Sequence, residues 1–238
     1  MRNGAEVVDI LGVRVVSARL SKVLEVLASK LSKRIYDKPF FVVTVNSEFM
    51  MLAQEDEEFR KILNEADLAL ADGMGLKLAR VKNIVPGRKL VEELLKLGTK
   101  VFFLGGREGV SRAMPEKYGG EWDEGEKKIR TGERESLRIL NKINEYKPDL
   151  LLVAYGAPWQ EKWLNANRHR LKAKVVMGVG GVFDYLTGKT KLPPELISGI
   201  GLEWLWRLVH EPWRWRRQVK LLKFVWLVLK TEMLSLMR

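Results

Sequence analysis

Residues 40 to 46 read Phe40-Phe41-Val42-Val43-Thr44-Val45-Asn46, a continuous apolar run that ends in a polar amide. Such a run, without alternation between polar and apolar residues, is typical of a parallel strand that is buried on both faces. Helical spacing of apolar residues follows it, from Glu48 to about Asn64. The stretch therefore predicts one strand–helix unit of an α/β protein.

The same unit recurs along the chain. Buried strands are expected at 68–71, 100–104, 150–154 and 175–179, and helices at 90–97, after Gly109, at 133–146 and at 159–171. A short hairpin at 7–16 and a helix at 19–34 precede the first unit. Strands that alternate with helices of about ten or more residues predict a Rossmann-like, mostly parallel sheet with helices on both faces.

The composition fits one buried core and excludes several kinds of site. At 238 residues the chain has room for one core domain, expected at 1–192, and an amphipathic helical appendage, expected at 193–238. Because the chain has no cysteine, disulfide scaffolds, thiolate metal sites and cysteine nucleophiles are excluded. Only two histidines are present, which makes a histidine-rich metal site or a Ser-His-Asp triad hard to assemble.

The positive charge is concentrated at the carboxyl end. The chain carries 42 Lys and Arg against 30 Asp and Glu, a formal net charge of +12. Residues 204–238 hold eight of these cations, two of the acids and five of the eight tryptophans. A charge of this sign favours an anionic partner, such as a phosphate, a nucleic acid or an acidic membrane surface.

The last predicted helix is amphipathic. One face carries Leu221, Leu222, Val225, Val228 and Leu229, and the other carries Lys220, Lys223 and Lys230. Tryptophan and cations beside an apolar face are typical of a helix that lies in a membrane interface, and a helix that packs on the core is the alternative. Without a signal-peptide pattern or a run long enough to span a bilayer, we expect a cytoplasmic protein, peripheral on the inner face of the cell membrane.

Four of the expected strands end in small or polar residues. These ends are Thr44-Val45-Asn46, Ala71-Asp72-Gly73, Leu104-Gly105-Gly106 and Gly178-Val179-Gly180-Gly181. The carboxyl ends of parallel strands meet at one edge of the sheet, where ligands bind, and glycine lets backbone N–H groups approach a phosphate. Together they predict a nucleotide or nucleotide-diphosphate pocket, although a tight turn explains each glycine taken singly.

Asp72 is the strongest candidate for a catalytic carboxylate. It lies between Ala71 and Gly73 at a strand end, where it can accept a proton from an attacking hydroxyl group. An Asx turn or a helix cap explains the same residue equally well. Asp184 is a second candidate, for orienting a loop or a ribose.

Other polar residues favour structural interpretations. Gln160 and Glu161 follow Pro158 at a helix start, where proline and glutamate are common. His169 lies between two arginines and fits a solvated basic face. No pair of carboxylates resembles a DxD metal motif, so we expect no essential metal and no cofactor.

Further stretches complete a pattern that extends from about residue 7 to the end of the chain. They are Glu48, Ala66-Asp67-Leu68, Met74-Gly75, Val85-Pro86-Gly87, Phe103-Leu104, Ala154-Tyr155-Gly156-Ala157-Pro158-Trp159-Gln160-Glu161-Lys162-Trp163, Val182-Phe183-Asp184 and Gly201-Leu202-Glu203-Trp204-Leu205-Trp206-Arg207-Leu208 with Glu211-Pro212. Together with the four strand ends, and in this order, they resemble the WecG/TagA/CpsF family of glycosyltransferases.

The resemblance implies an inverting glycosyltransferase. Its substrates would be a UDP-linked N-acetylmannosamine-type sugar and the GlcNAc of a polyprenyl diphosphate, and its product would serve a teichoic acid linkage unit, a capsule or an exopolysaccharide. Asp72 would be the base, and Arg214 and Arg217 of a basic, membrane-docking appendage would stabilise the departing UDP. Thr44, Asn46, Gln160, Gly105, Gly106, Gly180, Gly181, Asp184, Arg88 and Arg216 would bind the substrates.

Two features depart from the family pattern. Ile84 stands before Val85-Pro86-Gly87, where family members often carry arginine, so Arg80, Lys82 or Arg88 is expected to supply that phosphate contact. The stretch at 114–129 is short and charged, where relatives have a longer segment with an extra strand. The donor or the acceptor can therefore differ from those of the best-known members.

Other hypotheses stay open. The main alternative is a non-catalytic module that binds nucleic acid through the basic, tryptophan-rich tail. The leading hypothesis, by contrast, involves no nucleic acid. An NAD-type oxidoreductase is disfavoured because no strand carries the dinucleotide fingerprint. A homo-oligomer that hides part of the apolar appendage is also compatible with the sequence.

Overall fold

The computed structural model describes residues 5–33, 37–106, 109–125, 137–190, 194, 203–210 and 215–236. Eight strands in these ranges form one sheet, in the order β1-β2-β4-β3-β8-β7-β5-β6. The strands are β1 (Glu6–Ile10), β2 (Val13–Ser17), β3 (Phe40–Val45), β4 (Leu68–Ala71), β5 (Val101–Gly105), β6 (Glu121–Asp123), β7 (Leu150–Ala154) and β8 (Val175–Gly178). Among them β1 and β2 form an antiparallel hairpin and the other pairs are parallel, which confirms the predicted sheet.

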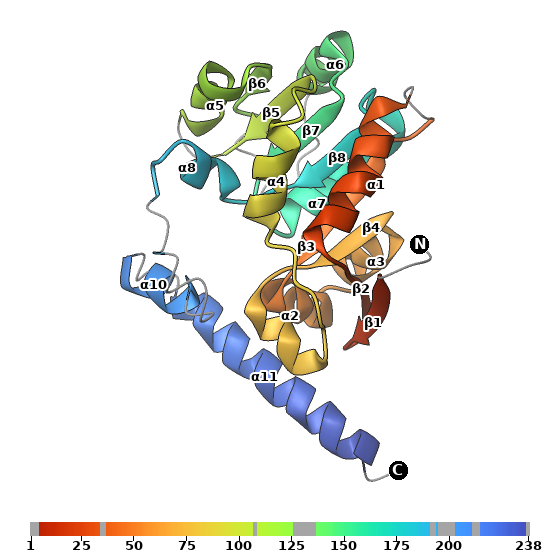
Figure 1. Cartoon of the computed structure of the whole chain (residues 1–238), viewed down its shortest axis with the longest axis vertical. Coiled ribbons are helices and arrows are strands. Elements are labelled where there is room, and N and C mark those ends of the chain that lie inside the picture. The colour runs from red at the N-terminus through yellow and green to blue at the C-terminus, as the bar shows by residue number, and fades with distance from the viewer. Residues whose placement is uncertain are drawn as a thin grey trace.

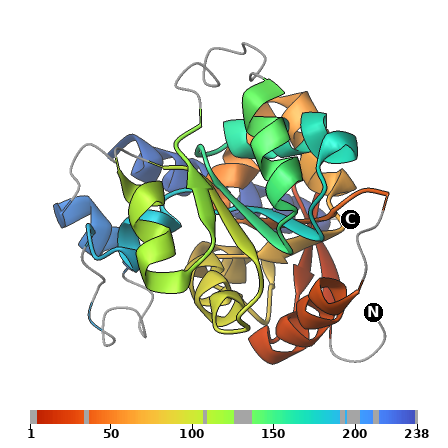
Figure 2. The ribbon, with the colours of Figure 1, turned by 90° about the horizontal axis from the view of Figure 1, so that it is seen from above.

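Helices cover both faces of this sheet (Figures 1 and 2). One face carries α1 (Leu20–Ser32), α4 (Gly87–Leu95), α5 (Val110–Tyr118) and α8 (Val182–Leu186). The other carries α2 (Ser47–Glu55), α3 (Glu57–Glu65), α6 (Leu137–Tyr146), α7 (Trp159–Asn167) and α11 (Trp215–Leu236). The described chain also contains α10 (Glu203–His210) and the 3-10 helices η1 (Met74–Ala79) and η3 (Arg168–Arg170).

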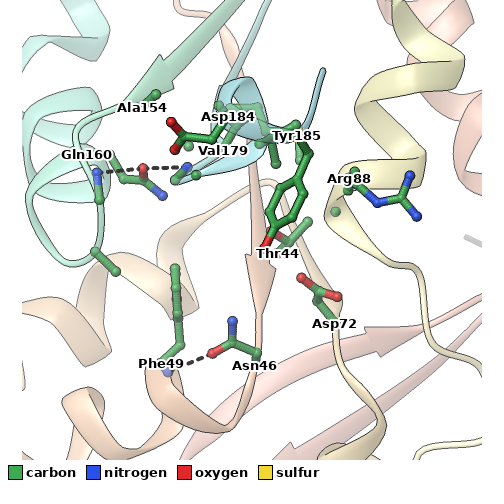
Figure 3. Close-up of a pocket in the computed structure, with 18 of the residues that line it drawn as sticks. Thr44, Asn46, Phe49, Asp72, Arg88, Ala154, Gln160, Val179, Asp184 and Tyr185 are labelled. Carbon is green, nitrogen blue, oxygen red and sulfur yellow. Dashed lines mark hydrogen bonds between the residues drawn. The ribbon is translucent and has the colours of Figure 1, made fainter. Parts of the chain in front are cut away.

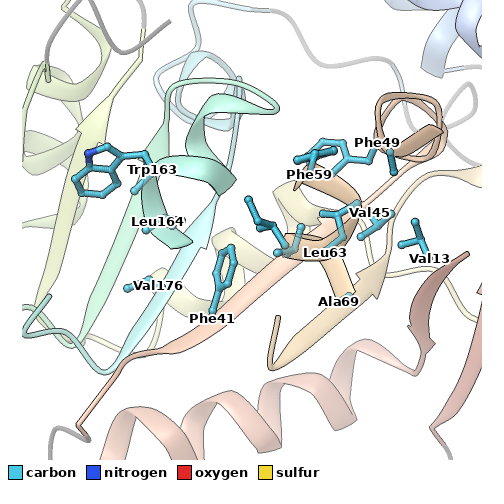
Figure 4. Packing of buried hydrophobic residues seen from close by; sticks show 14 of the residues in the cluster. Val13, Phe41, Val45, Phe49, Phe59, Leu63, Ala69, Trp163, Leu164 and Val176 are labelled. Atoms are coloured by element: carbon cyan, nitrogen blue, oxygen red, sulfur yellow. The ribbon is translucent and has the colours of Figure 1, made fainter. Parts of the chain in front are cut away.

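Alternation along the central strands separates two hydrophobic clusters. In β3 the side chains of Phe41, Val43 and Val45 join the cluster under α2, α3 and α7, part of which Figure 4 shows. Val42 joins the cluster under α1 and α4 on the opposite face. Because successive strand residues point to opposite faces, the unbroken apolar run of β3 fills both layers at once.

The centre of the sheet is the pairing of β3 with β8. The paired positions run from Phe40 with Val175 to Val42 with Met177. Beyond them β3 remains paired with β4 as far as Val45, while β8 remains paired with β7 as far as Gly178. The two central strands therefore part before their carboxyl ends, and the sheet opens there.

The predicted helix at 48–64 is in fact two helices. Asp56 ends α2 and caps α3, since its carboxylate accepts a hydrogen bond of 2.9 Å from the Phe59 N–H. The first N–H groups of a helix have no acceptor within it, and the Asp56 carboxylate supplies one for α3, so one helix ends and the next begins at this residue.

The short charged stretch near 120 keeps a strand, β6, whose buried Asp123 forms an ion pair with Arg138 at 2.7 Å.

The sequence suggested that the basic run Arg168-His169-Arg170 is solvated, but the structure shows that part of it is buried. Arg168 is buried, where its Nε donates to the Pro39 carbonyl at 2.9 Å and its guanidinium pairs with Asp67. Asp67 also accepts the Phe41 N–H at 2.7 Å. The pair satisfies backbone groups at the start of β3, which is why a cation enters the core at this position.

Helix α11 has apolar side chains on two opposite faces. Phe224 and Val228 are buried in the cluster that contains α2 and η1. Leu222, Trp226, Leu229 and Met233 are exposed and lie on the opposite side at helical spacing. The single apolar face predicted for this helix is therefore wrong, because Val228 is buried while Leu222 and Leu229 are exposed.

In the described ranges, no helix combines the length and the apolar character that crossing a membrane requires.

Candidate active site

A cavity of about 250 Å³ opens where β3 and β8 part. Its wall is made by residues at or just after the carboxyl ends of β3, β4, β5, β7 and β8 and by residues of α2, α4, α7 and α8. The lining residues are Thr44, Asn46, Glu48, Phe49, Asp72, Pro86, Gly87, Arg88, Gly106, Ala154, Gly156, Ala157, Gln160, Met177, Gly178, Val179, Gly180, Gly181, Val182, Asp184 and Tyr185. The site thus lies at the carboxyl edge of the parallel sheet, where such folds bind ligands.

Most of the residues proposed from the sequence meet in this cavity. Those that line it are Thr44, Asn46, Asp72, Arg88, Gly106, Gln160, Gly180, Gly181 and Asp184. Gly105 lies beside the cavity and not in its wall, and a Cβ there would come within 2.7 Å of the Tyr155 ring. Arg214 lies outside the described residues, as do the side chains of Arg216 and Arg217.

Thr44 and Asp72 lie side by side against the start of α4 (Figure 3). A Cβ placed on Gly87 would be 3.0 Å from Thr44 Oγ1 and 3.3 Å from Asp72 Oδ2, so both oxygens face the same glycine. The Asp72 backbone N–H donates to Val45 at 2.8 Å, and Gly73, with φ of 84°, turns the chain directly after it. Sheet hydrogen bonds and a glycine turn therefore fix the base of the Asp72 side chain.

The start of α4 gives this wall a positive character. Gly87 is the first residue of α4, whose amino-terminal N–H groups carry partial positive charge. Arg88 lines the cavity beside it, and its Nη1 donates to Glu92 at 2.5 Å. Among the three cations considered as substitutes for the arginine absent at Ile84, Arg88 lines the cavity, whereas Lys82 pairs with Glu6 at 3.2 Å.

Asn46 combines a structural role with a free donor group. Its Oδ1 caps α2 by accepting the N–H groups of Glu48 and Phe49 at 3.0 and 3.1 Å. Its Nδ2 makes no hydrogen bond within the described ranges, and in Figure 3 the amide nitrogen points into the cavity. The cap holds the amide in place, and the two Nδ2 hydrogens can face a ligand.

Gln160 joins two loops of the cavity wall. Its Oε1 accepts the Gly156 N–H at 3.1 Å and the Gly180 N–H at 2.9 Å, so one amide oxygen links the segments that follow β7 and β8 (Figure 3). Its Nε2 donates to Glu161 at 2.6 Å. Since the N–H of Gly180 is used in this way, and that of Gly106 donates to Ala154, both glycines shape the cavity by having no side chain.

Glu161 lies in the first turn of α7, as the sequence predicts, but its side chain is fully buried, which the sequence does not predict. Burial raises the pKa of its carboxyl group from 4.5 to about 8, while the hydrogen bond from Gln160 acts in the opposite direction. Its second oxygen, Oε2, has no hydrogen-bond partner among the described residues. The side chain is therefore neutral at pH 7.

Several lining residues were not predicted as site residues. Tyr185 comes from α8, one residue after Asp184, and Phe49 comes from the first turn of α2. Neither has a sequence signal that separates it from an ordinary helical aromatic. Gly87 and Gly156 had such a signal, since each is a glycine beside a proline or at a strand end.

The cavity is polar but holds no obvious metal-binding set. In the part of the chain that the structure describes, no three His, Asp or Glu side chains lie close enough together to hold a metal ion. The polar side chains of its wall are three carboxylates, two hydroxyls, two amides and one guanidinium, beside a helix amino terminus: Glu48, Asp72, Asp184, Thr44, Tyr185, Asn46, Gln160 and Arg88. This set suits a ligand with hydroxyl groups and a negatively charged phosphate.

The sequence model of the glycosyl transferase WecG/TagA/CpsF family matches residues 8–237, nearly the whole chain. The protein belongs to this family. A relative from Bacillus subtilis (strain 168) is 29% identical over 209 residues, which cover 80% of this chain and 79% of the relative. Another, from Bacillus spizizenii, is 31% identical over 217 residues, covering 84% and 82%. Both are named N-acetylglucosaminyldiphosphoundecaprenol N-acetyl-beta-D-mannosaminyltransferase.

Membership in the WecG/TagA/CpsF family confirms the resemblance on which the sequence interpretation rested. It supports a glycosyltransferase role for the protein. The alternative of a non-catalytic nucleic-acid-binding module finds no support in these relatives.

Gly87→Ala tests the close approach of Thr44 and Asp72 to α4. The added methyl group must displace Thr44 Oγ1 or Asp72 Oδ2 by a few tenths of an ångström, and we expect sugar transfer to fall about tenfold, because reactive groups tolerate little displacement. The helix itself favours alanine, so the unfolding free energy should change by no more than about 1 kcal/mol. Lys89→Ala, exposed in the same helix, is the control. A fully active Gly87→Ala enzyme would show that this contact is unimportant.

Glu161→Gln tests the buried neutral carboxyl group. Because its pKa is raised in the folded protein, Glu161 ionises in the unfolded chain between pH 4.5 and about 8 while it stays protonated in the fold. The folded state therefore loses stability as the pH rises through this range. Above pH 8 this costs on the order of 5 kcal/mol. Denaturant unfolding of both proteins from pH 5 to pH 8.5 should show the variant gaining stability over the wild type as the pH rises. Parallel curves would contradict the assignment.

Proposed function

We propose that the protein is an inverting glycosyltransferase for a lipid-linked acceptor. It transfers an N-acetylmannosamine-type sugar from a UDP-sugar to the GlcNAc of a polyprenyl diphosphate, in the synthesis of a teichoic acid linkage unit, a capsule or an exopolysaccharide. The names of the two Bacillus relatives support the sugar and the acceptor. The observation that carries the proposal is the placing of Asp72 beside Thr44 on a cavity wall formed by the amino terminus of α4 and Arg88.

In this proposal Asp72 is the general base. The acceptor hydroxyl gives its proton to the Asp72 carboxylate as its oxygen forms a bond to the anomeric carbon of the donor. The bond from that carbon to the diphosphate oxygen breaks with its electron pair, and UDP leaves from the opposite face, so the configuration inverts. Thr44, Asn46 and Gln160 bind the sugar through their hydroxyl and amide groups.

Negative charge accumulates on UDP as it leaves, and fixed positive groups stabilise it. Arg88 and the amino terminus of α4 supply such groups on the described wall. Arg214, Arg216 and Arg217 of the basic tail are the proposed additional cations, so that transfer proceeds without a metal ion. Gly106, Gly180, Gly181 and Asp184 form the uridine diphosphate side of the cavity.

The exposed face of α11 is proposed to dock on the inner face of the cell membrane. Leu222, Trp226, Leu229 and Met233 form an apolar stripe there, each more than half exposed. Lys223 and Lys230 are exposed on the same helix, and the Lys230 ammonium lies 5.1 Å from the centre of the Trp226 ring. An apolar stripe with tryptophan and lysine suits the boundary between acyl chains and anionic headgroups, where a lipid-linked acceptor would be reached.

Asp72→Asn tests the base. The amide cannot accept the acceptor proton, so we expect the rate of labelled sugar transfer to a short-chain lipid-diphosphate GlcNAc acceptor to fall by at least about 100-fold. Binding of UDP, measured by isothermal titration, should change less than threefold because asparagine has nearly the same shape. Asp9→Asn, an exposed change in β1, is the control. If Asp72→Asn retains near-wild-type turnover, another group is the base.

The double variant Leu222→Ser, Trp226→Ser tests the membrane-facing stripe. Removing two exposed apolar side chains should lower binding to anionic phosphatidylglycerol vesicles on the order of tenfold, as measured by co-sedimentation. The stability should stay close to that of the wild type, since both side chains are exposed. Val7→Ser removes an apolar side chain that is 65% exposed in β1 and should leave vesicle binding unchanged. Equal binding of the double variant and the wild type would exclude this face.

A further inference from the structure

The side-chain amide of Gln160 has one hydrogen-bonding group left over. An amide offers two acceptor positions on oxygen and two hydrogens on nitrogen. The N–H groups of Gly156 and Gly180 occupy the Oε1 positions, and Glu161 accepts one Nε2 hydrogen. The second Nε2 hydrogen has no partner among the described residues, although Gln160 lines the cavity. This hydrogen is available to a ligand.

Glu161 holds the nitrogen end of that amide from inside the protein. Its Oε1 lies 2.6 Å from Gln160 Nε2, and its side chain is fully buried. The space for this contact exists because residue 178 of β8 is a glycine: a Cβ there would collide with Glu161 Oε1 and come within 2.7 Å of Gln160 Nε2. Two backbone donors on the oxygen side and one acceptor on the nitrogen side together fix the plane of the amide.

Stability alone does not explain the position of Glu161, because a carboxyl group buried in this way lowers the stability of the fold. A buried carboxyl group whose second oxygen lacks a partner is destabilising, and an apolar side chain of similar size would fill the same space without that penalty. Its nearest polar partner is a residue of the cavity wall. Groups that lower stability in this way are typical of sites where orientation matters for function.

We propose that Glu161 is a positioning residue: it holds the Gln160 amide so that the second Nε2 hydrogen is presented to an oxygen acceptor on the sugar-nucleotide donor. The proposal rests on the proposed function for the identity of that ligand. Glu161 itself does not line the cavity and acts through Gln160. The carboxyl oxygen is needed as an acceptor, and a negative charge is not.

Kinetics of Glu161→Gln and Glu161→Met test the proposal. Glutamine keeps an acceptor oxygen in the same place, so its KM for UDP-N-acetylmannosamine should stay within about twofold of the wild type. Methionine fills the space without an oxygen acceptor, and its KM should rise about fivefold to tenfold, as for the loss of one hydrogen bond, with kcat changed less than twofold. A wild-type KM for the methionine variant, or an equal defect in both variants, would overturn the assignment.

A double-variant cycle separates action through Gln160 from a general effect on the fold. Gln160→Met removes the proposed donor to the ligand. In that background Glu161→Met should raise the KM no further, because the group that it positions is already gone. Additive effects of the two changes would mean that Glu161 does not act through Gln160, and the proposal would then be wrong.

Amide hydrogen exchange in the ligand-free protein gives a readout that does not depend on the proposed function. Glu161→Met should speed exchange at Gly156 and Gly180 severalfold, while Glu161→Gln leaves both unchanged. The Val85 N–H, which donates to Ala71 elsewhere on the sheet edge, is the internal control. Faster exchange in a protein without transferase activity would refute the proposed function alone. Unchanged exchange and KM in an active transferase would refute the positioning role alone.

Discussion

The parting of β3 from β8 is the constraint on which the site depends. These strands pair as far as Val42 and Met177, and then each follows its other neighbour, β4 or β7. Beyond this point β3 and β8 no longer pair with each other, so the residues that follow line an opening between the two strands. Thr44 and Gly178 mark its two sides. The same parallel pairing that buries the core therefore leaves a polar cavity at one edge.

Much of this arrangement could be predicted because it follows from local rules. A continuous apolar run can be buried on both faces only in a covered sheet, and parallel strands bring their carboxyl ends to one edge. The residues after four strands are therefore expected to be neighbours, and Asn46, Asp72, Gly106 and Gly180 do line one cavity. The elements that fit this scheme, such as β4 and β7, have the ends that their sequences predict.

The remainder depended on packing between elements that are distant in the chain. Glu161 fits an ordinary helix start, and only the glycine of β8 against which it packs shows that it is buried. Arg168 fits a solvated basic run, and only its approach to Asp67, 101 residues earlier, explains its burial. In α11, helical spacing identified apolar positions but could not divide them between Phe224, which is buried, and Leu222, which is exposed. Such assignments require the partner surface.

The inner face of α11 has a consequence for any attempt to work with the core alone. Phe224 and Val228 belong to the same buried cluster as the residues of α2 and η1, and η1 begins two residues after Asp72. A chain shortened to residues 1–192 would expose that apolar surface to water beside the cavity. Such a fragment would be prone to self-association even though every residue in the described cavity wall is still present, so the tail is better altered by surface substitution than by truncation.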